Sequence, residues 1–250
     1  FSIAYKKIET DAKKIHRDCI KSSKYIEECY FPCYSKTIHS VDKGTLSVIF
    51  LMYRIQGGAA MLQKFKVQNF KNFRDEFVWD FSNTKSYEFH QEFVPQGIMK
   101  NAIVFGENAS GKTNLGWAVM DIVIHLTDSM KNIANYHNYV NLNSSDKLAR
   151  FEYTFCFGGN LLVYYYEKEE VGKVLREKIS INHHEILSAE LGYEAKVHLK
   201  GAENLNLDMW DGSISFVKYV VRNTVLDRKD TDCRTFRQFV RFVEHMFWFS

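Results

Sequence analysis

The stretch Gly106-Glu107-Asn108-Ala109-Ser110-Gly111-Lys112-Thr113 decides which fold this sequence predicts. It fits the pattern G-x-x-x-x-G-K-[ST], which forms a phosphate-binding loop when a strand precedes it and a helix follows it. The run Ala102-Ile103-Val104-Phe105 just before it is apolar, which predicts a strand buried on both faces. The residues after it have helical periodicity, with one apolar face at Leu115, Val119, Ile122 and Leu126. The motif is therefore preceded by a predicted strand and followed by a predicted helix, as a phosphate-binding loop requires.

Each residue type in the loop has its own chemical task. Gly106 and Gly111 let the backbone turn tightly and bring N–H groups close to phosphate oxygens. Lys112 supplies positive charge to the β- and γ-phosphates and is the expected catalytic residue, while the Thr113 hydroxyl is the expected ligand of Mg²⁺. The predicted nucleotide-binding residues are Gly106, Glu107, Asn108, Ala109, Ser110, Gly111, Lys112, Thr113 and Asn114.

Two strands are predicted ahead of the loop. Residues 62–70 alternate, with Leu62, Lys64 and Lys66 on one side and Gln63, Phe65, Val67 and Asn69 on the other. Residues 76–81 repeat the signal, with Phe77, Trp79 and Phe81 on one side. We expect the two strands to be neighbours.

A hairpin and a helix are predicted behind the loop. Residues 150–157 and 161–167 are rich in β-forming side chains and are joined by Gly158-Gly159-Asn160. We interpret the aromatic stripe of the first strand as sheet core, and the alternative is stacking of nucleic-acid bases. Residues 235–248 predict a closing helix. The stripe consists of Phe151, Tyr153, Phe155 and Phe157, and the apolar face of the helix of Phe236, Phe239, Val240, Val243 and Phe247.

The residues around the loop resemble a known group of proteins. Asn108, Asn114 and the earlier segment Asn69-Phe70-Lys71-Asn72-Phe73 are similar to the ABC-type ATPases of the SMC, RecF and OLD group, in particular to AAA-family ATPases of bacterial phage-defence loci. The resemblance starts at Met61 and becomes less specific toward Ser250. It implies an α/β P-loop NTPase fold: an ABC-type ATPase head, N-terminal lobe, with a mixed sheet, the loop helix and an antiparallel β subdomain.

The resemblance also implies an activity and partners. The nucleotide is ATP with Mg²⁺, and the complete protein hydrolyses ATP as a head-to-head homodimer in DNA repair or anti-phage defence. Its action is on DNA or on an effector nuclease. Lys71 or its neighbour Asn69 is expected to reach the nucleotide, with a solvated strand end as the alternative for this position.

Hydrolysis in that group needs further motifs that we do not find. An acidic motif of four apolar residues followed by Asp-Glu holds Mg²⁺ and activates water, but the apolar run 216–221 ends in Arg222-Asn223. The stretch 187–192 faintly resembles the signature motif, and we reject it because no Asp-Glu strand follows. Residues 61–250 are therefore expected to be a lobe cut before the signature and the acidic motif. A non-hydrolysing nucleotide-binding scaffold and a small P-loop kinase are the alternative functions.

The first 60 residues differ in charge from the rest. They contain ten basic and six acidic residues, against 23 basic and 24 acidic residues in 61–250. Met61 follows Gln56-Gly57-Gly58, which a ribosome-binding sequence can encode, so we expect residues 1–60 to be upstream read-through, or else a helical extension. The net charge of +3 over 250 residues is then no evidence for nucleic-acid binding.

The remaining features predict little chemistry. Cys19, Cys29 and Cys33 with His16 and His39 match no standard zinc spacing, and Cys156 and Cys233 are expected to be ordinary thiols. His183-His184-Glu185 is expected to be a surface turn. No signal peptide or membrane span is visible, which favours a cytoplasmic location without membrane contact.

Overall fold

The computed structural model describes residues 47–50, 52–55, 58–84, 94–99, 101–104, 106–127 and 137–249. The chain divides into two units, Phe1–Lys43 and Gly44–Ser250, and the described residues belong to the second. The cysteines and histidines weighed as a zinc site, from His16 to His39, lie outside the described residues.

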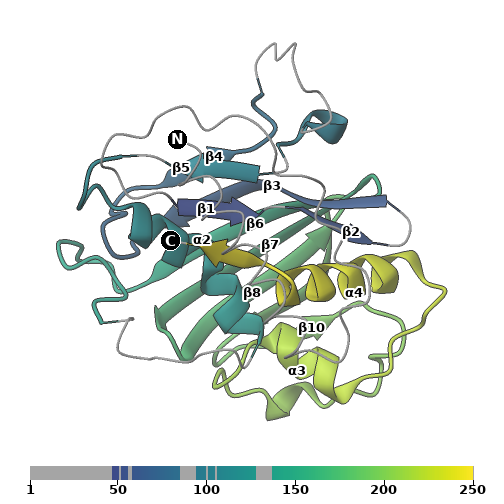
Figure 1. Ribbon diagram of the computed structural model, residues 1–250. Coiled ribbons are helices and arrows are strands. Elements are labelled where there is room, and N and C mark those ends of the chain that lie inside the picture. The colour runs from purple at the N-terminus through teal and green to yellow at the C-terminus, as the bar shows by residue number, and fades with distance from the viewer. Residues whose placement is uncertain are drawn as a thin grey trace, which may run out of the picture. The chain divides into compact units, whose positions relative to one another are not determined.

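A large antiparallel sheet is the main element of the second unit (Figure 1). It has eight strands in the order β10-β9-β8-β7-β6-β3-β2, with β4 also paired to β3. The strands are β2 (Met52–Ile55), β3 (Gly58–Gln68), β4 (Phe77–Asp80), β6 (Ala149–Phe157), β7 (Asn160–Glu170), β8 (Lys173–Ile181), β9 (His184–Glu190) and β10 (Lys196–Val197).

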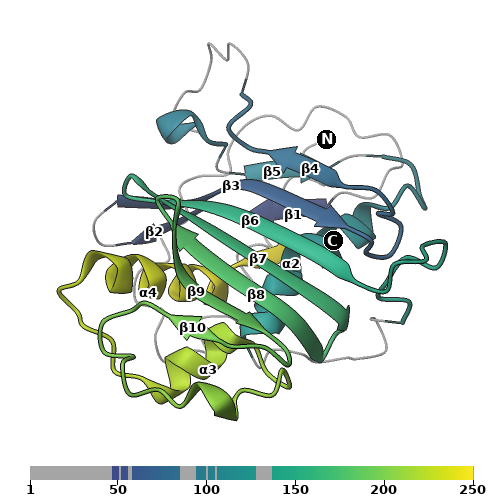
Figure 2. The ribbon, with the colours of Figure 1, turned by 180° about the vertical axis from the view of Figure 1, so that it is seen from behind.

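A second, three-stranded sheet carries the strand that precedes residues 106–113. Its order is β11 (Phe247–Phe249), β1 (Ser47–Phe50) and β5 (Asn101–Val104). The helices are α2 (Lys112–Leu126), α3 (Phe216–Asn223) and α4 (Thr231–Glu244), with short 3-10 turns η2 (Pro95–Gly97) and η4 (Leu207–Met209). Helices α2 and α4 cover one face of the large sheet, and the opposite face is in front in Figure 2.

The α/β class and the antiparallel sheet are confirmed, but the mixed sheet is not. Every strand pairing among the described residues is antiparallel. The physical reason lies in the connections, because β6 to β9 follow one another through tight turns, and such turns join only antiparallel neighbours.

The predicted hairpin is confirmed. Strands β6 and β7 are joined by Gly158 and Gly159, whose φ angles are 57° and 93°. A two-residue turn of this kind needs positive φ at both positions, which glycine adopts without strain.

The aromatic stripe of β6 is core, as predicted. Phe151, Tyr153, Phe155 and Phe157 are buried, while the alternate residues of the strand are partly exposed. Helix α4 packs on this face, and the rings of Phe239 and Phe242 lie 5.4 and 5.3 Å from that of Phe155. Because the rings are buried, the alternative of base stacking by this stripe is wrong.

The alternation predicted for residues 62–70 is wrong at its start. A register shift between Leu62 and Lys64 marks a β-bulge in β3 opposite β6. The bulge changes the phase of the alternation, so that Leu62 is buried together with Phe65 and Val67, while Lys64 points to the other face. Strand β4 pairs with β3 as expected, from Lys64 opposite Asp80 to Val67 opposite Phe77.

The face of the large sheet opposite α2 and α4 carries matched charges. Acidic and basic side chains alternate across neighbouring strands, and exposed pairs of this kind contribute little stability. They do balance the charge of the side chains that form them. The pairs include Lys64–Asp80 at 3.2 Å, Lys66–Glu152 at 2.9 Å, Arg176–Glu190 at 2.7 Å and Lys178–Glu185 at 2.7 Å.

The closing helix has other bounds than predicted. Asp230 caps α4 by accepting hydrogen bonds from the N–H groups of Asp232 and Cys233, so the helix starts at Thr231 instead of residue 235. It ends at Glu244, and Phe247–Phe249 pair with β1 as strand β11. The prediction of a helix through residue 248 is therefore wrong, because strand pairing takes these residues.

Three smaller expectations concern other parts of the chain. The apolar run 216–221 lies in helix α3, and residues 187–190 lie in strand β9, so neither forms the rejected motifs. Asn182 and His183 have positive φ and turn the chain between β8 and β9, which confirms the surface turn for His183, whereas His184 and Glu185 already belong to β9. Residues 47–50 and 52–55 form β1 and β2, and β3 begins at Gly58. Whether residues 1–60 are read-through stays a prediction.

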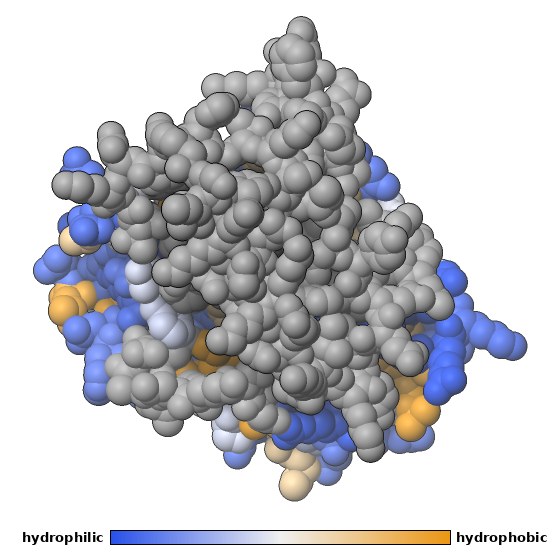
Figure 3. Space-filling model, in the orientation of Figure 1, coloured by the Kyte–Doolittle hydropathy of each residue, from blue (hydrophilic) through white to orange (hydrophobic). Residues whose placement is uncertain are grey.

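In the face drawn in Figure 3, hydrophobic residues form small separate groups among hydrophilic ones. None of the helices in the described ranges combines the length and the hydropathy that crossing a bilayer requires.

We predict that Phe155→Ala destabilises the second unit by about 3–5 kcal/mol, because it leaves a cavity beneath α4. Thr154→Ala, on the opposite face of the same strand, should cost less than about 1 kcal/mol. Urea unfolding followed by circular dichroism measures both values. Equal losses in the two variants would contradict the assignment of the aromatic face as the core.

Candidate functional site

The predicted strand, loop and helix are present. Strand β5 ends at Val104 and α2 begins at Lys112, with residues 106–111 between them. Ala102 and Val104 are only half-buried, so the expectation of a strand buried on both faces is wrong for these two positions. We call residues 106–113 the phosphate loop.

The two glycines of the motif differ in how strongly the loop geometry demands them. A Cβ on Gly106 would lie 2.8 Å from the Ser110 hydroxyl oxygen. Gly111 has a φ of 91°, and a Cβ there would lie 2.8 Å from the Asn72 side-chain nitrogen. A Cβ at position 106 would be accommodated by rotation of the Ser110 side chain, whereas any other residue at position 111 would be strained by the positive φ and would displace the Asn72 side chain.

The Lys112 side chain lies over the phosphate loop. Its Nζ donates to the carbonyl oxygens of Gly106 at 2.8 Å and Glu107 at 2.6 Å, and to the Ser110 hydroxyl at 3.3 Å. Only 9% of the residue is exposed. The ammonium group is thus held at the centre of the loop, where it attracts anions.

The beginning of α2 adds a second source of positive potential. Gly111 is the N-cap residue, and no side chain caps the first turn. Unsatisfied N–H groups and the helix dipole make such an end an anion site. A cavity of about 230 Å³ opens here, lined by Asn108, Ala109, Ser110, Gly111, Lys112, Thr113 and Asn114.

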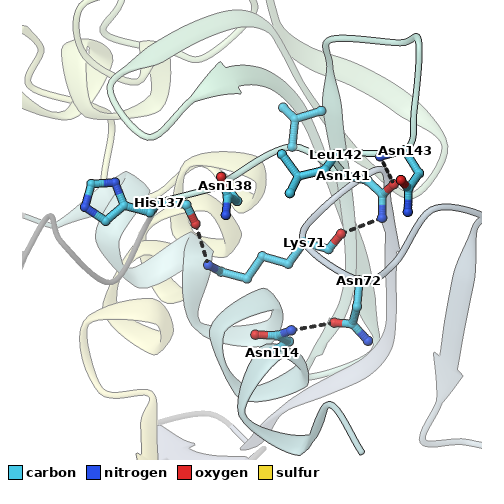
Figure 4. A pocket seen from close by; sticks show the side chains of 9 residues that line it. Lys71, Asn72, Asn114, His137, Asn138, Asn141, Leu142 and Asn143 are labelled. Carbon is cyan, nitrogen blue, oxygen red and sulfur yellow. Dashed lines mark hydrogen bonds between the residues drawn. The ribbon is translucent and has the colours of Figure 1, made fainter. Parts of the chain in front are cut away.

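A second cavity adjoins the first. Its volume is about 390 Å³, and it shares Asn114 with the loop cavity. Figure 4 shows amide side chains around it, with the Lys71 side chain crossing the view toward the carbonyl oxygen of His137. The lining residues are Lys71, Asn72, Asn114, His137, Asn138, Val140, Asn141, Leu142 and Asn143.

The walls of the second cavity are tied together by backbone hydrogen bonds. The Lys71 N–H donates to the Tyr139 carbonyl at 2.9 Å, and the Asn141 side-chain nitrogen donates to the Lys71 carbonyl at 2.6 Å. Phe70 also forms a bridge with Val140. Hydrogen bonds therefore hold the residues that follow β3 against the segment 137–143.

Asn72 connects the two cavities. Its side-chain oxygen accepts from the side-chain nitrogen of Asn114 at 2.8 Å, and its nitrogen lies against Gly111. The N-F-K-x-F segment is therefore in direct contact with the phosphate loop, as Figure 4 shows for the Asn72–Asn114 pair.

Asn69 and Lys71, the two residues considered as contacts of the nucleotide, have different surroundings in the structure. Asn69 is 2% exposed, and its side-chain nitrogen donates to the carbonyls of Asp146 and Leu148 at 2.8 and 2.9 Å. Lys71 lines the second cavity, and burial lowers the pKa of its ammonium group. Asn69 thus holds a loop in place, and Lys71 faces the second cavity.

The loop cavity presents hydroxyl and amide side chains as donors for a metal ion. The exposed Thr113 follows Lys112 and lines the loop cavity with its hydroxyl-bearing side chain. Within the described ranges no group of three or more His, Cys, Asp or Glu side chains forms a metal site of its own. Mg²⁺ commonly keeps several waters and is held by few protein oxygens together with substrate phosphates.

Sequence reasoning missed most of the second cavity. Asn72, His137, Asn138, Asn141 and Asn143 line it together with the exposed Leu142. The only signal for it was the high density of asparagine between residues 138 and 143.

Sequence reasoning also missed two polar residues inside the apolar pattern of α2. Asp121 and His125 are both buried. The ring of His125 stacks on that of Tyr166 at 4.3 Å, and its Nε2 lies 3.6 Å from an oxygen of Glu177, which is also fully buried.

Burial has the largest effect on the pKa of His125, whereas the pKa of Glu177 is decided by its charged and hydrogen-bonding neighbours. Loss of solvent and the nearby Lys168 lower the pKa of His125, against the opposing effects of Glu177 and Asp121. Burial by itself raises the pKa of Glu177, but His125 and hydrogen bonds from the Phe216 N–H and Tyr164 outweigh it, so that the pKa is lowered. The folded protein therefore holds the pKa values of both groups below their ordinary values.

A comparison of the sequence with known protein families finds no match, and neither does a comparison with curated proteins. The assignment of a function rests on the geometry described above.

We predict that His125 makes the protein less stable in mild acid. Below the ordinary histidine pKa of 6.5 the unfolded chain takes up a proton that the folded protein does not. Stability is therefore full above about pH 6.5 and falls below it, by at most about 1.4 kcal/mol per pH unit.

The test compares free energies of unfolding at about pH 7.5 and pH 5.5, a window in which Glu177 stays ionised. His125→Phe keeps the ring stacking and removes the titration, so its stability should fall less steeply than that of the wild type. His183→Asn, in the exposed turn, should follow the wild-type curve. Parallel curves for all three proteins would contradict the prediction.

Proposed function

We propose that this protein binds a nucleoside triphosphate, ATP, with its phosphates in the phosphate loop. The observation that carries the proposal is the position of the Lys112 ammonium group above the loop, beside a helix end that no side chain caps. A triphosphate would replace the loop carbonyls and the Ser110 hydroxyl as the partner of Lys112. Backbone N–H groups at the start of α2 would donate to the same anion.

The nucleoside end fits the second cavity. This cavity adjoins the loop cavity at Asn114, so a ligand that extends beyond the phosphates enters it directly. Amide side chains offer both donors and acceptors, as the edge of a base requires. The half-buried Lys71 and the exposed Leu142, at the lining of the same cavity, supply a charge and an apolar surface.

Mg²⁺ belongs to the proposed ligand. Thr113 would hold it together with the β- and γ-phosphates, and the ion would neutralise charge on the phosphate oxygens. Hydrolysis further requires a base that activates water. No Asp or Glu is among the described residues that line the two cavities. We therefore propose binding as the activity of these residues, and ATP hydrolysis as an activity of the complete dimeric protein.

The wider role follows from the resemblance of the motifs alone. A head-to-head homodimer acting on DNA or with an effector nuclease, in DNA repair or anti-phage defence, is the proposal for the complete protein. A non-hydrolysing scaffold would bind the same ligand. Turnover of ATP by the complete protein separates these two alternatives.

We predict that Lys112→Ala weakens the binding of Mg-ATP by about 3 kcal/mol, on the order of a hundredfold, because it removes a charge-assisted contact to phosphate. Lys147→Ala, an exposed lysine outside both cavities, is the matched control and should bind like the wild type. Isothermal titration calorimetry measures both affinities. Unchanged affinity in Lys112→Ala would count decisively against the assignment.

We also predict that Lys71→Met lowers the affinity for ATP by about 1 kcal/mol, while the affinity for inorganic tripolyphosphate stays unchanged. Tripolyphosphate occupies only the loop cavity, whereas ATP spans both cavities. An equal loss for both ligands would place the effect of Lys71 on the phosphates and contradict a nucleoside end in the second cavity.

A further inference from the structure

A fully buried carboxylate lies on α2 beyond the phosphate loop. One oxygen of Asp121 accepts from the Lys168 ammonium group and from the Tyr166 hydroxyl, both at 2.9 Å. The other oxygen accepts from the Tyr139 hydroxyl at 3.0 Å. Asp121 and Lys168 are both 0% exposed. We call these four residues the Asp121 cluster.

Stability alone does not account for this cluster. Taking two charges out of water costs several kcal/mol per ion, and apolar replacements of buried ion pairs are often neutral or stabilising. Helix α2 already buries apolar side chains such as Ala118, Val119 and Ile122 near this point. The charged group adds directional hydrogen bonds, which can form only when the helix has one particular rotation and axial position.

The cluster joins the elements that form the two cavities. Lys112 and Asp121 lie on the same helix, nine residues or about 13 Å apart along its axis. Tyr139 belongs to the segment whose neighbours His137, Asn138 and Val140 line the second cavity. The Tyr139 carbonyl also accepts from the Lys71 N–H at 2.9 Å.

One carboxylate therefore bonds both to the sheet and to the wall of the second cavity. Lys168 and Tyr166 belong to β7, and Tyr139 belongs to the cavity wall. Since α2 begins at the phosphate loop, the same contacts set the distance between the loop and that wall. A ligand that spans both cavities depends on this distance, and a ligand in the loop alone does not.

We propose that Asp121 and Lys168 are positioning residues for the nucleotide, which set the spacing between the phosphate loop and the cavity wall at 137–143. This inference rests on the proposed function, because it concerns the same ligand. Neither residue touches the ligand. They act through α2 and through Tyr139.

The test replaces the cluster by apolar groups of similar shape and compares two ligands. The variant carries Asp121→Leu, Tyr139→Phe, Tyr166→Phe and Lys168→Met, so that no partner is left buried and unpaired. A milder variant carries only Asp121→Asn and Lys168→Met, in case the first does not fold. Tyr164→Phe is the control, because it removes an equally buried hydroxyl that donates to Glu177 and leaves the cluster intact.

Calorimetry with Mg-ATP and with inorganic tripolyphosphate is carried out at a temperature at which every variant is folded by circular dichroism. We expect the ratio of the two affinities to fall roughly tenfold in the cluster variants and to stay at the wild-type value in Tyr164→Phe. A folded cluster variant with the wild-type ratio would overturn the inference. Wild-type protein that binds neither ligand would instead overturn the proposed function, and the inference with it.

Discussion

The aromatic face of the large sheet has to be removed from water, and most of the structure follows from this requirement. Strands β6 and β7 present stacked rings on one side, with Phe151 and Tyr166 5.0 Å apart. Helices α2 and α4 cover this face, and burial of each large ring contributes on the order of 2–3 kcal/mol. The opposite face keeps matched charges. The helix that bears the phosphate loop is thus placed by the packing of the sheet.

Polar groups within this core limit how α2 lies on the sheet. Rings alone would allow the helix to slide or rotate at little cost, since apolar contacts have no direction. The tyrosine hydroxyls remove that freedom: Tyr153 donates to the Ala118 carbonyl at 3.0 Å, and Tyr166 donates to Asp121. On strand β8, the buried Glu177 accepts from the Phe216 N–H at 2.7 Å and holds the start of α3. A network of buried tyrosines and carboxylates thereby connects α2 and α3 to the sheet.

The phosphate loop and the second cavity then have different physical origins. The loop is local, because its glycines, lysine and helix start follow one another in the chain. The second cavity is assembled from three separate parts, namely the end of β3, the start of α2 and the segment 137–143. Hydrogen bonds between Lys71, Tyr139 and Asn141 join two of these parts, and the Asn72–Asn114 pair joins the third.

The sequence by itself determined the phosphate loop, the hairpin at Gly158-Gly159 and the aromatic core strand, because each depends on residues close in the chain. It did not determine the bulge near Leu62, the strand at Phe247–Phe249 or the pairing of β3 with β6, since these depend on partners far away in sequence. Only the tertiary structure decided that Asp121 meets Lys168, 47 residues later, and that Lys71 faces a cavity while Asn69 is buried. Spacing along the chain predicts contacts within one element, whereas contacts between elements are chosen by packing.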